Sequence, residues 1–72
     1  MKSFFRELMK QGKDIKWLAK EVGVSAQSIY SWKLGKSKPK TQHMQKIAKV
    51  LKMDIDKIID DFYKEKHEHD KK

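Results

Sequence analysis

The chain has 72 residues and no cysteine, so it has room for one small domain and can form neither a disulfide framework nor a thiolate metal site. Its 18 Lys and Arg residues against 10 Asp and Glu residues give a formal net charge of +8, which favours an anionic polymer as partner. Arg6 and Glu7 interrupt the apolar N-terminal residues, which excludes a signal peptide or a membrane span there. We expect a soluble, cytoplasmic protein.

Apolar residues recur at helical spacing along the chain, which predicts an all-α, compact five-helix bundle. Gly12 ends the first helix, and Asp14 can cap the second. The residues expected to face the core in these two helices are Phe4 or Phe5, Leu8, Met9, Leu18, Ala19 and Val22.

Residues 15–34 carry the most informative pattern, that of a helix-turn-helix. Gly23 provides a turn residue that tolerates positive φ, and Ser25 offers a side-chain oxygen to cap the following helix. Ile29 and Trp32 lie three positions apart, so they share the inward face of that helix. The outward residues include no acid and are mostly short or polar: Ala26, Gln27, Tyr30, Ser31 and Lys33. This profile is typical of a helix that lies in the DNA major groove.

The helix over residues 26–34 ends at Gly35, and a loop with the only proline leads to a fourth helix that starts near Thr41. Asp54 can cap a fifth helix. The residues expected in the core from these two helices are Met44, Ile47, Ala48, Leu51, Ile55, Ile58, Ile59 and Phe62. The apolar face of the fifth helix, which also includes Tyr63, is wide enough that part of it could instead form a two-fold dimer seam.

The last residues, 64–72, have no apolar side chain, so we expect a charged, disordered tail after a helix-turn-helix domain over residues 1–63. No acidic residue occurs between Glu21 and Asp54. Seven lysines lie in this acid-free segment: Lys33, Lys36, Lys38, Lys40, Lys46, Lys49 and Lys52. Such a concentration of positive charge indicates a polyanion as partner. The alternative is a basic surface that only keeps the protein in solution.

Several short motifs support a more specific interpretation. They are Leu18-Ala19, Gly23-Val24-Ser25, Ile29, Gly35-Lys36, Pro39, Ile47-Ala48, Leu51 and Ile58. In these residues the chain resembles the lambda-repressor-like (Cro/C1-type, XRE-type) helix-turn-helix family of bacteria and their phages, from Phe5 to about Phe62. The resemblance implies a five-helix bundle that binds a pseudopalindromic operator on double-stranded DNA, usually as a homodimer.

Carried over by position, the resemblance implies base reading by four residues: Ala26, Gln27, Tyr30 and Ser31. Gln27 can form a bidentate hydrogen bond with adenine, and Ala26 can contact a thymine methyl group. The expected phosphate contacts are Lys16, Ser28, Lys33, Lys36, Lys38 and Lys40. Two positions depart from the family. Ile15 replaces a glutamine that often clamps a phosphate, and Lys33-Leu34 replaces Glu-Asn.

The expected function is sequence-specific DNA binding by a Cro-like repressor, bacterial or phage-encoded and located at the nucleoid. An antitoxin or antirepressor that binds a protein remains an alternative, as does an excisionase-like factor that bends DNA. No nucleophile with a base partner occurs, so we expect no enzyme and no cofactor. His67 and His69 have no cysteine partner and lie in the expected tail, so we expect no metal site either.

Overall fold

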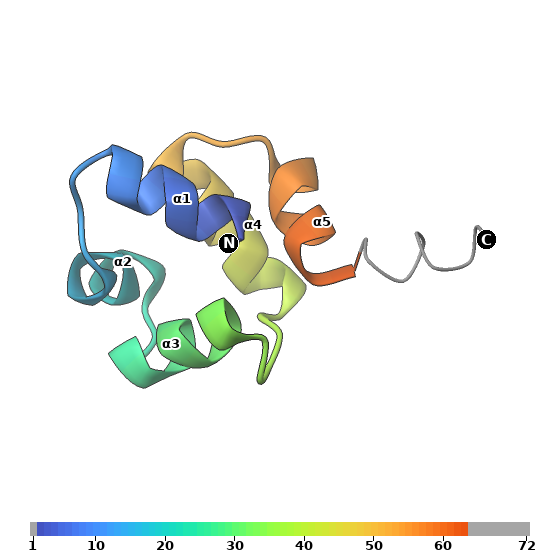
Figure 1. Cartoon of the computed structure of the whole chain (residues 1–72), viewed down its shortest axis with the longest axis horizontal. Coiled ribbons are helices and arrows are strands. Elements are labelled where there is room, and N and C mark those ends of the chain that lie inside the picture. The colour runs from blue at the N-terminus through green and yellow to red at the C-terminus, as the bar shows by residue number, and fades with distance from the viewer. Residues whose placement is uncertain (1, 64–72) are drawn as a thin grey trace.

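The computed structural model describes residues 2–63, which form five helices (Figure 1). Their bounds are Ser3–Lys10 (α1), Ile15–Val22 (α2), Ala26–Leu34 (α3), Thr41–Leu51 (α4) and Ile55–Tyr63 (α5). α4 packs against α1, α2 and α5, whereas α3 packs chiefly against α2. As a result, α3 lies along one edge of the bundle with no helix beyond it (Figure 1). The predicted all-α five-helix bundle is confirmed; the predicted tail lies outside the described residues.

One hydrophobic core joins all five helices. The largest side chains with no appreciable exposure are Phe4, Leu8, Leu18, Ile29, Ile47, Leu51 and Ile58. Trp32 is only 5% exposed, as its spacing from Ile29 predicts. Full burial of each large apolar side chain contributes about 1.5–3 kcal/mol, so this cluster is the main source of the stability of the domain.

One expectation about the core is wrong, and another holds only in part. Met9 is 56% exposed, because it follows the buried Leu8 and one residue turns an α-helix by about 100°. Ile55 and Ile59 pack against the core but are only half-buried, because the centre of the α5 contact is the stripe that carries Ile58 and Phe62.

Four of the described helices end in the same hydrogen-bonded motif, in which an amide donates to the carbonyl five residues earlier. The pairs are Lys13 to Leu8 (3.1 Å), Val24 to Ala19 (3.0 Å), Lys36 to Ser31 (2.9 Å) and Met53 to Ala48 (2.9 Å). The motif needs a left-handed residue just before the donor. Glycine occupies that position in three cases, but after α4 it is Lys52, with φ of 59°.

We expect Lys52→Gly to raise the free energy of unfolding by about 0.5–1 kcal/mol in a urea titration. The left-handed conformation costs an L-residue about 1–2 kcal/mol, and the greater freedom of glycine in the unfolded chain offsets part of the gain. The matched control is Gly23→Ala in the same motif. It should destabilise the domain through its φ of 87° alone, since no atom lies within 4 Å of the added Cβ. Equal stability of both variants and the parent would contradict this account.

The N-terminus of α1 is capped by a carboxylate from α5. Asp61 Oδ1 accepts a hydrogen bond from the Ser3 amide at 2.7 Å. Its Oδ2 accepts from the Phe4 amide at 3.1 Å and from the Ser3 hydroxyl at 3.0 Å. Lys2, at the cap position itself, makes no such side-chain bond. The first helix is therefore fixed to the last described one by polar contacts as well as by the core.

Candidate nucleic-acid interface

The helix-turn-helix is built from local hydrogen bonds that the sequence predicted. The Trp17 amide donates to Asp14 Oδ1 at 2.9 Å, which caps α2. Gly23 adopts the left-handed conformation with φ of 87°, and the Ser28 amide then donates to Ser25 Oγ at 3.2 Å, which caps α3. The Gly23 turn and the Ser25 cap set the direction in which α3 leaves α2, and the three features together confirm the predicted caps and turn.

The outer side of α3 presents a stripe of exposed residues. Gln27 is exposed, Tyr30 is 49% exposed and Leu34 is 63% exposed. Spacings of three and four residues place all three on one face of the helix. The other two residues predicted to read bases, Ala26 and Ser31, are half-buried at the flanks of this face. Ala26 also packs against the core. Gln27 and Tyr30 are therefore the predicted reading residues that project furthest.

The residues predicted to contact phosphate come from α2, α3 and the loop before α4. Lys16 is exposed in the first turn of α2, and Lys36, Lys38 and Lys40 are exposed in the loop before α4. The Lys38 ammonium lies 4.6 Å from the centroid of the Tyr63 ring, so its side chain reaches toward the end of α5.

Ser28 is half-buried, and its hydroxyl lies 3.1 Å from Ser25 Oγ, so either atom can donate to the other. The Ser28 side chain therefore already takes part in the cap of α3. A phosphate contact from this hydroxyl would have to be made in addition to that hydrogen bond.

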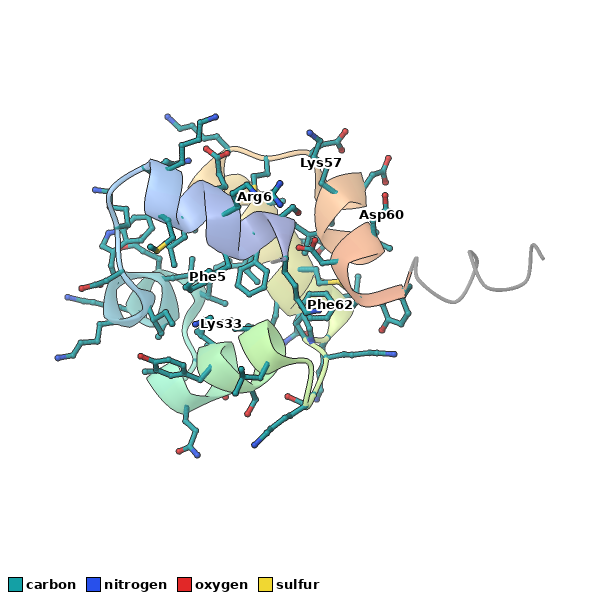
Figure 2. The ribbon with its side chains drawn as sticks, in the orientation of Figure 1. Phe5, Arg6, Lys33, Lys57, Asp60 and Phe62 are labelled. Atoms are coloured by element: carbon teal, nitrogen blue, oxygen red, sulfur yellow. The ribbon has the colours of Figure 1, made fainter. Side chains whose placement is uncertain are left out.

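Lys33 occupies a place that the sequence did not indicate. Its side chain is half-buried, and its Nζ lies 4.3 Å from the ring centroid of Phe5 and 5.9 Å from that of Tyr30. Figure 2 shows Lys33 between α3 and the Phe5 ring on α1. The predicted phosphate contact would require this ammonium to leave both rings.

The first turn of α4 adds a group that sequence reasoning missed. The amides of His43 and Met44 donate to the Lys40 carbonyl at 2.9 and 3.0 Å, which leaves the amides of Thr41 and Gln42 facing the helix end. No acid lies in this turn, and the Lys40 side chain does not cap it. Helix N-termini of this kind attract phosphate. The signal in the sequence was the lack of a capping side chain before Thr41.

His43 connects this helix end to α3. Its ring lies 5.6 Å from the ring of Trp32, with an interplanar angle of 34°. Because Trp32 belongs to the core, this contact holds the first turn of α4 at a set position relative to α3.

Among the described residues, no helix combines the length and the apolar composition that a membrane crossing requires.

The capped α2, the glycine turn and the α3 helix with its uncovered, acid-free face define a helix-turn-helix DNA-binding domain. A family model described as Helix-turn-helix matches residues 5–58, and the chain belongs to this Cro/C1-type helix-turn-helix family. The family binds double-stranded DNA in proteins of the transcription-regulator type and is not a family of enzymes. No match to the chain was found among curated proteins or among solved structures.

Proposed function

We propose that the protein is a small Cro-like transcriptional repressor from a phage or mobile element, which reads an operator through α3. The observation that carries this proposal is the exposed stripe of Gln27 and Tyr30 on the uncovered side of α3. That stripe lies within a segment that contains no acid between Glu21 and Asp54. A helix with such a face can enter the major groove without repulsion from the DNA backbone.

Within this proposal, the reading face has a centre and two flanks. Gln27 bonds the N6 and N7 edge of adenine, and the Tyr30 hydroxyl bonds a neighbouring base edge. Ala26 and Ser31 contact bases only where the groove wall approaches the flanks of α3, because both are half-buried.

Phosphates on either side of the groove then meet different parts of the domain. Lys16 in the first turn of α2 and the Ser28 hydroxyl in the first turn of α3 form one group, and Lys36, Lys38 and Lys40 in the loop before α4 form the other. The first turn of α4 adds backbone amides to this second group. These contacts place α3 in the groove but carry no sequence information of their own.

We further propose that the operator is pseudopalindromic and bound by a homodimer. The half-buried Ile55 and Ile59, together with Tyr63 at 44% exposure, offer apolar surface on α5 for a two-fold contact. The domain responsible is assigned to residues 1–63.

The test of the function is selection of bound duplexes from a random pool. Enrichment of one motif with two related halves is the expected result for a dimeric repressor. A pool that stays random after several rounds would overturn sequence-specific reading and favour the antitoxin or architectural interpretation.

A second measurement tests the docking face. Replacing Lys36 and Lys38 together by alanine should make the slope of log affinity against log salt concentration less steep by about two units. Each phosphate contact contributes about 0.9 to that slope. The matched control removes Lys10 and Lys57 from α1 and α5; Lys57 lies on the side of the molecule away from α3 (Figure 2). Equal slopes for the two double variants would show that the loop does not face DNA.

A further inference from the structure

The contact of Lys33 with two aromatic rings joins the exposed face of α3 to α1. Tyr30 lies three residues before Lys33, one helical turn away, so the two side chains share one side of α3. Lys33 Nζ lies 5.9 Å from the Tyr30 ring and 4.3 Å from the Phe5 ring. An ammonium within about 6 Å of a ring centroid is attracted to the electron-rich face of the ring. Lys33 can therefore restrain Tyr30 from the side that faces the bundle.

The Phe5 ring is itself held firmly in place. It is 8% exposed and meets the Phe4 ring edge to face, at 6.5 Å between centroids and an angle of 82°. The Phe4 ring in turn stacks on Phe62 of α5, at 6.0 Å and 24°. Lys33 therefore rests on an aromatic cluster anchored in two other helices, and its methylene stem can pack along the same surface.

We propose that Lys33 is a positioning residue for sequence reading, which orients Tyr30 and fixes α3 against α1 instead of contacting a phosphate. The inference rests on the proposed function, since it concerns which base pairs α3 reads. It also assigns buried Phe5, which no base can reach, an indirect part in discrimination between DNA sequences.

The test compares affinities for a selected and a scrambled duplex. Lys33→Met keeps the unbranched stem and removes the charge. We expect the ratio of the two affinities to fall about fivefold, the equivalent of one cation–π contact. The salt dependence should stay that of the parent. Lys33→Arg should restore the ratio, because a guanidinium also binds ring faces.

Phe5→Leu provides a second arm, with thermal melts to confirm that each variant is folded at the temperature of the titration. It should lower the ratio as Lys33→Met does, and the double variant should lose little more, since both changes remove one contact. Equal weakening on both duplexes by Lys33→Met, with a salt slope lower by about one unit, would overturn the proposal in favour of a phosphate contact. A parent protein that binds both duplexes equally would overturn the proposed function as well.

Discussion

Asp61→Ala is expected to lower the free energy of unfolding by about 2–3 kcal/mol, measured by urea denaturation. Hydrogen bonds to a charged group contribute about 1.5–3 kcal/mol, and this carboxylate accepts bonds from both Ser3 and Phe4. Without it, the amides that begin α1 lose their acceptors in a partly buried position, where water replaces them poorly.

The neighbouring Asp60 supplies a matched control. It is exposed on the same helix, and its replacement by alanine changes the net charge by the same amount. We expect Asp60→Ala to stay within about 0.5 kcal/mol of the parent, as surface substitutions generally do. Asp61→Asn should fall between the two, because one side-chain oxygen remains to accept. Equal stabilities for Asp60→Ala and Asp61→Ala would mean that the cap on α1 contributes nothing.

This cap shows which parts of the fold were not predictable from the sequence. Asp14 and Ser25 could be assigned as caps because each bonds an amide three residues ahead, and Gly23 could be assigned because a turn after a helix requires positive φ. The bond from Ser3 to Asp61 spans 58 residues. Nothing local marks it, and it exists only because the bundle brings α5 beside the start of α1.

The candidate site also has features that the sequence predicts and features that only the fold determines. Helical spacing identified the outward face of α3 and the inward Trp32, since these depend only on the period of the helix. The direction of the Lys33 side chain depends on which surface stands opposite it, and that surface is Phe5 on another helix. The resemblance to the family therefore suggested a phosphate contact for Lys33, whereas the fold offers it an aromatic surface.

Gln27→Ala is expected to reduce sequence discrimination at one base pair of each half-site while leaving non-specific binding almost unchanged. Gln27 is exposed in the first turn of α3, where a helix in the major groove brings side chains to base edges. A bidentate contact to adenine is worth about 1–3 kcal/mol against the wrong base, so affinity for the selected duplex should fall about 5- to 150-fold.

Two titrations at one fixed salt concentration measure this effect, one with the selected duplex and one with a scrambled duplex. Gln42→Ala is the matched control, since it deletes the same kind of exposed side-chain amide from the first turn of α4, where the proposed phosphate contacts are made by backbone amides that the substitution leaves in place. Its effect should be equal on both duplexes. If a dimer binds, the specificity lost with Gln27 should map to two symmetric base pairs about one helical turn apart. Equal losses on both duplexes for Gln27→Ala would mean that α3 does not read bases through this residue, and binding to a protein or bending of DNA would then be the better interpretation.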